Sequence, residues 1–267
     1  MTNLLYKASI VTTPTAYGVG VLNSIKPASG NADFDFTRTS SATRVNPDYL
    51  IETVATDIPR LDYTNGTASI LLENQSTNLI TYSEDFSNAF WTKTGASVVS
   101  DATTSPDGTI NADKLVEDTS TGQHNIKKVN SPISSSFYNG KIFVKANGSP
   151  KLAFSESGAT GSYLAIDLNN GNVLASNLLG SYSVNALPNG WFEVNISPNT
   201  ANVRFDFAVF LLDANYTTGT PAGYSYTGDG TSGAYIWGAQ LEALSYPTSY
   251  IPTSGSTVTR AAETLNN

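Results

Sequence analysis

The sequence predicts an all-β protein, in which an antiparallel jelly-roll β-sandwich follows a small β-rich N-terminal arm or domain. Apolar and polar residues alternate with a period of two in several segments, as in strands that are buried on one face. Gly, Pro and Asn separate these segments at intervals of about 8 to 12 residues, which is typical of sandwiches and barrels. Only 13% of the 267 residues are charged, and 40% are apolar. This composition indicates a packed β core under a neutral polar surface.

Residues 1–79 are predicted to form the N-terminal arm. The run LLYKASIVT near its start has the composition of a strand. Further along, Asn65-Gly66 lies between two apolar runs in IPRLDYTNGTASILLEN. Because Asn and Gly suit a turn with positive φ at both central residues, this segment is expected to be a hairpin.

Residues 80–250 carry the recurring strand pattern and are predicted to form the sandwich. In WFEVNI, Phe192, Val194 and Ile196 are expected on one face of a strand, and Trp191 on the other. The patterned segments are KIFVKA (141–146), YLAIDLNNGNVLA (163–175, a hairpin turning at 169–172), WFEVNI (191–196), VRFDFAVFL (203–211) and AYIWGAQLEAL (234–244). Two prolines stop the last strand, so residues 251–267 are expected to form an extended C-terminal tail.

The charge balance and the absence of cysteine exclude several classes of function. The formal net charge is −8, which argues against binding to nucleic acid or to an anionic membrane. There is no cysteine and one histidine, so thiolate chemistry and metal sites built from several imidazoles are excluded. No apolar run is long enough to span a membrane, and no secretion signal is evident at the N-terminus, so synthesis in a cytoplasm without export is expected.

Three segments of the chain resemble parts of the jelly-roll domains found in tailed-phage virion proteins. TNLITYSEDFSNAFWTKTG (77–95) resembles the entry into such domains, SPDGTINADKLVED (105–118) their next element, and YTGDGTSGAYIWGAQLEALSYPTSYIPTSG (226–255) their closing strand and tail. The jelly roll itself is similar to that of carbohydrate-binding modules of the xylan- and glucan-binding type. FTRTSSATRVNPDYLIETVATDIPRLDY (36–63) resembles a leader common in these phage proteins.

The resemblance implies a structural and adhesive virion component, such as a head fibre, a tail fibre or a capsid decoration. Its expected partners are other virion proteins, further copies of itself in a homo-oligomer (a trimer, as is usual for fibres) and host-surface glycans. Many copies would make weak contacts with glycans effective through avidity. Two alternatives remain, namely an architectural cement subunit without a ligand and a carboxylate-dependent polysaccharide depolymerase. Because no catalytic motif is present, an enzyme is not expected.

The candidate carbohydrate-binding residues are aromatic. Trp191 is expected on the polar face of its strand, and Tyr224 and Tyr226 flank the loop that holds Asp229. Flat rings stack on the apolar faces of sugars, while neighbouring polar groups bind the hydroxyls. The alternative is that Trp191 packs against the N-terminal region or a neighbouring subunit.

A structural calcium ion is the only cofactor considered, and it follows from the resemblance. Related carbohydrate-binding jelly rolls often hold calcium between the entry and closing strands, using oxygen ligands. Glu84, Asp85 and Glu242 lie in the matching segments.

For the other candidate residues, a structural role is expected rather than a catalytic one. His124 stands alone and is expected to be a polar loop residue. The sequence offers three carboxylate pairs, which are Glu84 with Asp85, Glu117 with Asp118, and Asp206 with Glu242. Adjacent residues on a strand point to opposite faces, so the first two pairs suit acid–base catalysis poorly. The glycines around Asp229 predict a tight turn, because no lysine follows as in a phosphate-binding loop.

Overall fold

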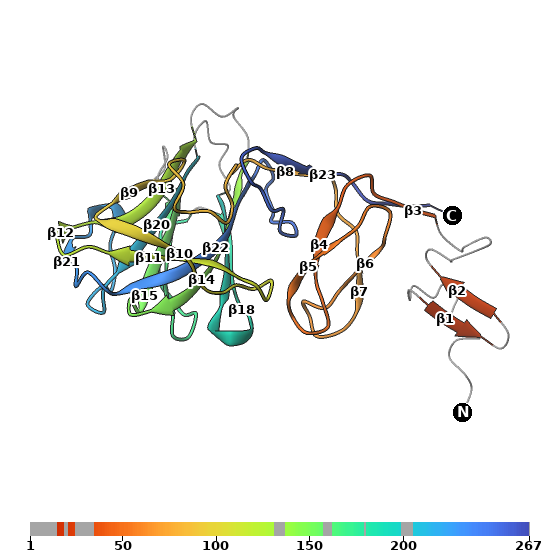
Figure 1. Cartoon of the computed structure of the whole chain (residues 1–267), viewed down its shortest axis with the longest axis horizontal. Helices are drawn as coiled ribbons and strands as arrows, with labels where there is room; N and C mark the ends of the chain where they lie inside the picture. The colour runs from red at the N-terminus through yellow and green to blue at the C-terminus, as the bar shows by residue number, and fades with distance from the viewer. Residues whose placement is uncertain are drawn as a thin grey trace. The chain divides into compact units, whose positions relative to one another are not determined.

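The computed structural model describes residues 15–18, 21–24, 35–130, 137–156, 162–178, 180–198 and 205–266. The chain divides into two compact units (Figure 1). Unit 1 comprises Met1–Ser76 and Thr259–Asn267, and unit 2 comprises Thr77–Val258. The stretch that begins at Thr77 is therefore the entry into a new unit.

Unit 2 is a sandwich of two six-stranded antiparallel sheets, as the sequence predicts. Sheet I has the order β10 (Ala96–Thr104), β11 (Ile110–Glu117), β22 (Gly233–Glu242), β14 (Asn139–Asn147), β19 (Phe192–Pro198), β18 (Gly180–Ala186). Sheet II has the order β17 (Val173–Ser176), β16 (Ser162–Asp167), β15 (Lys151–Glu156), β20 (Phe205–Leu212), β13 (His124–Asn130), β9 (Thr92–Thr94). A small ladder joins β12 (Thr121–Gly122) to β21 (Tyr226–Thr227). The described residues contain two short 3₁₀ helices, η2 (Pro188–Gly190) and η3 (Pro221–Gly223), and neither is long enough to cross a membrane.

The core of unit 2 lies between the inner faces of the two sheets. Phe192, Val194 and Ile196 of β19 all belong to this core, which confirms the predicted alternation. Phe207 and Val209 of β20 meet them from the opposite sheet. The outer face of sheet II carries a second buried cluster, which contains Ala153, Tyr163, Ala165, Ala208, Phe210, Leu212 and Tyr216.

A buried amide ties the entry segment of unit 2 to its closing strand. Asn78 is fully buried. Its Nδ2 donates to the carbonyl oxygens of Ala239 (3.1 Å) and Ile251 (2.8 Å). Its Oδ1 accepts the N–H groups of Ile80 and Leu241, both at 3.1 Å. One side chain thus satisfies backbone groups in three segments that are distant in sequence.

The segment after β22 is part of the sandwich, which corrects the prediction of a surface tail from residue 251 onward. Ile251 and Thr253 are 3% and 6% exposed. The N–H of Thr253 donates to Ser83 Oγ (2.8 Å), and the N–H of Ser83 donates to Thr253 Oγ1 (3.1 Å). These reciprocal bonds hold the closing segment beside the entry segment.

Unit 1 is built from two-stranded antiparallel sheets. The pairs are β1 (Thr15–Gly18) with β2 (Val21–Ser24), β3 (Asp35–Thr37) with β24 (Thr264–Asn266), β4 (Ala42–Val45) with β5 (Ile51–Val54), and β6 (Arg60–Asp62) with β7 (Ser69–Leu71). A further pair, β8 (Ser76–Asn78) with β23 (Val258–Arg260), contains the two points at which the chain passes from one unit to the other. The β6–β7 hairpin was predicted, but its loop covers residues 63–68, and positive φ occurs there only at Gly66 (79°). The predicted strand LLYKASIVT lies outside the described residues.

Charged side chains fill the interior of unit 1. Arg38 and Arg60 are 1% and 0% exposed, and the side chain of Glu263 is also fully buried. Glu263 pairs with Arg38 at 2.7 Å and with Arg60 at 2.5 Å. Arg60 and Arg260 both pair with Glu73. Residues 259–266 therefore complete unit 1, and the predicted separate tail of residues 251–267 does not exist as such.

Asn78→Ala is expected to lower the free energy of unfolding of unit 2 by at least about 3 kcal/mol, because four buried backbone groups lose their partner. Urea unfolding followed by tryptophan fluorescence measures this, since Trp91, Trp191 and Trp237 all lie in unit 2. Asn172→Ala, at an exposed turn, is the matched control and should change stability by less than about 0.5 kcal/mol. Equal effects of the two substitutions would show that the Asn78 amide is not a structural link.

Glu263→Ala is expected to destabilise unit 1 by about 3–5 kcal/mol, because it leaves two buried guanidinium groups without their shared carboxylate. Amide hydrogen exchange should lose protection in β4–β7, while the tryptophan signal of unit 2 stays unchanged. Glu52→Ala removes the half-exposed pair with Arg44 and should cost at most about 1 kcal/mol. Retained protection of β4–β7 in Glu263→Ala would contradict the importance of the buried network.

Candidate functional site

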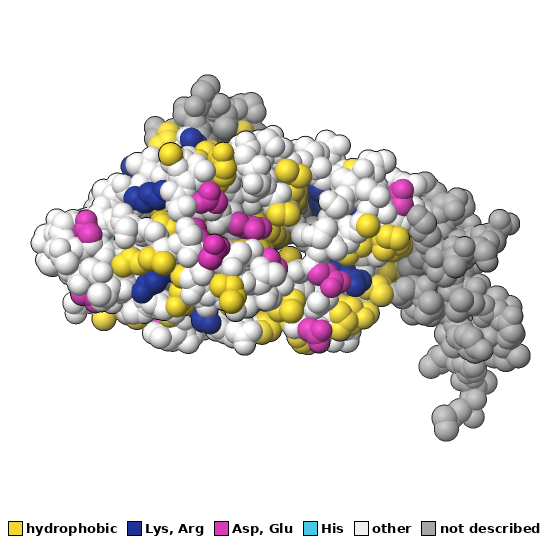
Figure 2. Space-filling view, in the orientation of Figure 1, with side chains coloured by type: hydrophobic (Ala, Val, Ile, Leu, Met, Phe, Trp, Pro, Cys, Tyr) yellow, Lys and Arg dark blue, Asp and Glu magenta, His cyan; other side chains and the backbone are white. Residues whose placement is uncertain are grey.

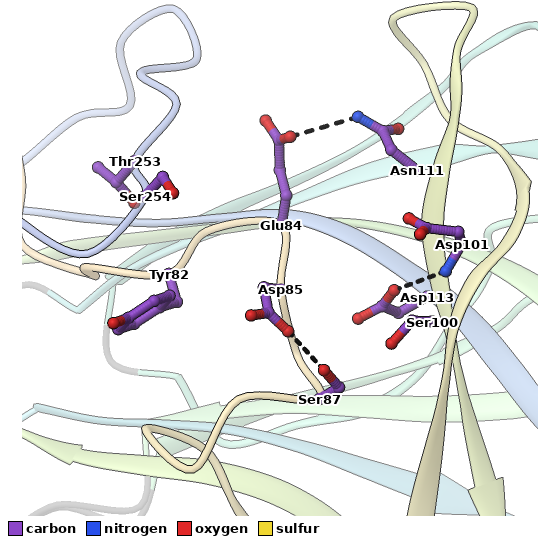
Figure 3. A pocket seen from close by; sticks show the side chains of 10 residues that line it. All are labelled: Tyr82, Glu84, Asp85, Ser87, Ser100, Asp101, Asn111, Asp113, Thr253 and Ser254. Carbon is purple, nitrogen blue, oxygen red and sulfur yellow. Dashed lines mark hydrogen bonds between the residues drawn. The ribbon is translucent and has the colours of Figure 1, made fainter.

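A polar pocket of about 430 Å³ lies in unit 2 between the entry segment, the β10–β11 hairpin and the closing segment (Figure 3). The residues that line it are Tyr82, Glu84, Asp85, Ser87, Ser100, Asp101, Asn111, Asp113, Thr253 and Ser254. The Ser83–Thr253 bonds and a bridge between Tyr82 and Ser254 bring two of its walls together. The same contacts that close the sandwich therefore shape the pocket.

The charged side chains that line the pocket are all acidic. Among the residues that the structure describes, the lining contains four carboxylates and no lysine or arginine. Hydroxyl groups and the Asn111 amide complete the described lining, in which Tyr82 is the only aromatic side chain. On the face drawn in Figure 2, several acidic side chains gather over the sandwich unit within a mostly uncharged surface. Such a lining presents many hydrogen-bond acceptors to a ligand that carries hydroxyl groups.

Asp113 is the buried member of the four carboxylates, at 2% exposure. Its Oδ2 accepts the N–H of Phe86 (2.8 Å), and its Oδ1 accepts the N–H of Asp101 (3.0 Å). Burial raises the pKa of Asp113 to about 6, although these two bonds act in the opposite direction. The carboxylates of Asp85 and Asp101 add to the rise.

Asp85 and Asp101 are the exposed carboxylates of the pocket. Asp85 accepts the Ser87 hydroxyl (2.6 Å) and the Asn88 N–H (3.0 Å). Burial alone would raise the pKa of Asp85, but these bonds outweigh it and hold the pKa below its ordinary value. Asp101 has φ 52° and sits where the register of β10 against β11 shifts. This bulge turns residue 101 to the pocket wall (Figure 3).

Glu84 and Asn111 point toward each other across the pocket (Figure 3). Glu84 accepts the Tyr250 hydroxyl at 2.9 Å and Asn111 Nδ2 at 3.3 Å. Burial raises the pKa of Glu84, the Tyr250 hydrogen bond lowers it, and nearby Asp107 raises it further. The net shift is upward. Asn111 Oδ1 is buried and has no hydrogen-bond partner among the described residues.

The three carboxylates predicted to hold calcium are not brought together. Glu84 and Asp85 line the pocket, whereas Glu242 does not. Glu242 is fully buried and accepts the N–H (3.0 Å) and the hydroxyl of Thr248. In the described part of the chain, no three Asp, Glu or His side chains are placed so that they could hold a metal ion. The donor set therefore does not fit the predicted calcium site.

The predicted aromatic platform does not form around Trp191. This side chain is 2% exposed, and its Nε1 donates to the carbonyl oxygen of Thr104 (3.1 Å) in β10. Thr104 belongs to the same sandwich, so this bond to the ring is made within unit 2. Trp191 thus offers no free ring to a sugar, and the expectation that it is exposed is wrong.

Tyr224, Tyr226 and Asp229 lie together but are engaged in loop structure. The Tyr224 and Tyr226 rings are 5.8 Å apart. Tyr226 donates its hydroxyl to Glu117 (2.6 Å), and burial together with Glu117 raises its pKa strongly. Asp229 accepts the N–H groups of Thr231 and Ser232, both at 2.6 Å. The glycine-rich loop is therefore a turn closed by its own aspartate, and none of these residues lines the pocket.

The remaining catalytic candidates have structural environments. His124 belongs to β13 and is 1% exposed, so it is not the loop residue that was expected. Its ring nitrogens face the carbonyl oxygens of Gly95 (2.5 Å) and Tyr226 (3.3 Å). Asp206 and Glu242 are both buried and belong to different sheets.

Sequence reasoning missed most of the pocket. Asn111 and Asp113 lie in SPDGTINADKLVED, and Tyr82 lies just before Glu84, so the motifs that carried the resemblance contain them. Asp101 had no sequence signal, because its position depends on the bulge in β10.

No family model and no curated protein matches the sequence. Among solved structures, one match is a Clostridium thermocellum endo-1,4-β-D-xylanase with its CBM22-1 and GH10 modules, complexed with xylohexaose. The identity is 14% and the TM-score 0.34, over 68% of this chain and 30% of that one. A second is the enzymatically active domain of tailspike protein 4 from bacteriophage CBA120, at 14% identity and TM-score 0.34, over 61% of this chain and 21% of that one. A third is a putative sugar binding protein from Bacteroides thetaiotaomicron, at 10% identity and TM-score 0.21, over 76% and 96% of the two chains.

The Asp113 carboxyl is expected to titrate with a midpoint near pH 6, while the midpoint of the Asp85 carboxyl lies below pH 3.8. Carboxyl ¹³C NMR resolves both. An unfolded aspartate releases its proton near 3.8, so between about pH 4 and 6 the folded state binds the extra proton. This group therefore makes the free energy of unfolding fall as pH rises through that window. A midpoint for Asp113 near the ordinary value of 3.8 would contradict the expected effect of burial on this carboxyl.

Proposed function

We propose that this protein is an adhesive structural component of a tailed-phage particle and that unit 2 binds host-surface glycan through the polar pocket. The observation that carries the glycan part is the pocket itself, with its carboxylates, amide, hydroxyls and single tyrosine ring. The virion part follows from the sequence motifs of the entry and closing segments.

The pocket has the size and the groups that a sugar ring requires. Its volume of about 430 Å³ is within the usual range for small-ligand sites. Asp85 and Asp101 are exposed and accept hydrogen bonds from sugar hydroxyls, while Tyr82 is half-buried and offers part of its ring to an apolar sugar face. Acidic sugars are disfavoured, because the lining contains no positive charge.

Weak binding suits the proposed role. The pocket has one aromatic side chain, so little apolar surface is buried by each sugar. Single-site affinity should therefore be low, and many copies on one particle would supply avidity. In this arrangement unit 1 serves attachment to other virion proteins, and unit 2 is displayed.

A second candidate function, a carboxylate-dependent depolymerase, is favoured by one specific observation. Asp113 has a pKa raised to about 6, whereas that of Asp85 is lowered, and both line the same pocket. Environments that separate two carboxyl groups in this way are found in glycoside hydrolases. Asp113 is buried and held by two backbone N–H groups, which favours a structural role for it. Release of reducing sugar from host polysaccharide, lost in Asp113→Asn, would establish the enzyme instead.

Tyr82→Ala and Asp101→Asn are each expected to weaken binding of a neutral oligosaccharide at least about tenfold, or roughly 1.4 kcal/mol. The oligosaccharide is chosen from a glycan array, and NMR titration of the full chain measures affinity. Val173→Ala is the control, because Val173 is 37% exposed, lies on β17 at an edge of sheet II and does not line the pocket. Asparagine keeps the left-handed backbone at position 101 accessible.

Removal of calcium with a chelator should leave glycan binding unchanged, because the three carboxylates predicted to bind calcium do not lie together. Equal losses in Tyr82→Ala and Val173→Ala would place the glycan elsewhere. If the folded chain binds no glycan of the array saturably, the glycan-binding part of the proposal is wrong, and an architectural subunit without a ligand remains.

A further inference from the structure

The two sheets of unit 2 end in four edge strands, β10, β18, β17 and β9, among the residues that the structure describes. An exposed edge presents unpaired N–H and C=O groups, and proteins normally protect it with shortness, charge, proline or a bulge. The four edges of unit 2 differ in this protection.

Three of the edges are protected. β9 has three residues, one of which is Lys93. β17 has four residues, and its pairing with β16 contains a register shift. β10 is long, but two register shifts and the left-handed, charged Asp101 interrupt it.

β18 has none of these devices. Its seven residues, GSYSVNA, include no charged residue and no proline. It pairs with β19 without a register shift from Gly180 to Ala186. Most of the strand is exposed, and Tyr182 is 47% exposed.

The hydrogen bonding between β18 and β19 determines which backbone N–H and C=O groups of β18 point away from its own sheet. Leu187, just after the strand, donates its N–H to the Trp191 carbonyl oxygen (2.8 Å), so it faces β19. Backbone direction alternates along an antiparallel strand, so Ser183 also faces β19, whereas Tyr182 and Val184 direct their N–H and C=O groups outward. Within the described part of the chain, these outward groups form an open ladder.

We propose that β18 pairs antiparallel with β18 of a second copy of this chain, about a two-fold axis at Ser183. In this register Tyr182 of one copy lies opposite Val184 of the other, an aromatic and β-branched pair that stabilises cross-strand contacts. The charge distribution also fits a second copy. Each chain carries a net charge of −8, which opposes self-association, but this strand is uncharged and lets two copies meet without like-charge contact. The pairing does not depend on the proposed glycan binding.

Ser183→Cys tests this pairing directly, because the chain contains no cysteine. The two Ser183 residues would form a pair without mutual hydrogen bonds, whose Cα atoms lie about 4.5 Å apart, within reach of a disulfide. Under mild oxidation the folded full-length variant should become a disulfide-linked dimer at least about ten times faster than Ser97→Cys, which places an exposed thiol on the irregular edge β10.

A second substitution tests the ladder. Tyr182→Pro removes an outward N–H that β19 does not use, so in the Ser183→Cys background it should abolish the rapid cross-linking, while Tyr182→Val should retain it. Circular dichroism confirms that each variant is folded. Cross-linking of Ser183→Cys at the rate of Ser97→Cys, or rapid cross-linking that survives Tyr182→Pro, would overturn the proposal.

Discussion

The architecture of unit 2 depends on the buried amide of Asn78. Its four hydrogen bonds satisfy backbone groups of the entry segment, of β22 and of the closing segment. A buried amide is stable only when its partners are present, so the three segments must be in place together. The pocket follows from this constraint, because Tyr82 and Thr253 extend from two of the segments that the amide joins. A site made by closure of the sandwich cannot form before the last strand has been added.

In unit 1, buried ion pairs join segments that are distant in sequence. The described residues of this unit bury three apolar side chains, Phe36, Ala42 and Val54, which is a small core for a folded unit. Buried ion pairs tolerate the loss of a partner poorly, so Glu263 makes this unit dependent on the end of the chain. Unit 2 is consequently an insertion between two parts of unit 1 in sequence.

The fold was predictable from the sequence because strand alternation is a local property. Phe192, Val194 and Ile196 repeat with period two, and they do face the core. The site was less predictable, because it depends on what covers a face and where a strand bulges. Period two put Trp191 on the face opposite to Phe192, but it contained no information that the ring would be buried with its Nε1 bonded to β10. Likewise, Glu242 lies in the expected strand, yet Thr248 occupies its oxygens. Asp113 can be recognised as a pocket residue only from the structure, in which its carboxylate accepts the N–H groups of Phe86 and Asp101.

The two proposals for unit 2 are geometrically compatible. The pocket adjoins β10 and β11 at one end of sheet I, and β18 forms the other end. Pairing through β18 would extend sheet I across two copies and leave both pockets at its far ends. The pairing would fix the distance between the two pockets. Two weak sites held at a fixed distance bind a repeating surface more tightly than either site alone, provided that the surface offers sugars at that spacing. The unprotected edge would then raise avidity without adding any contact to the ligand.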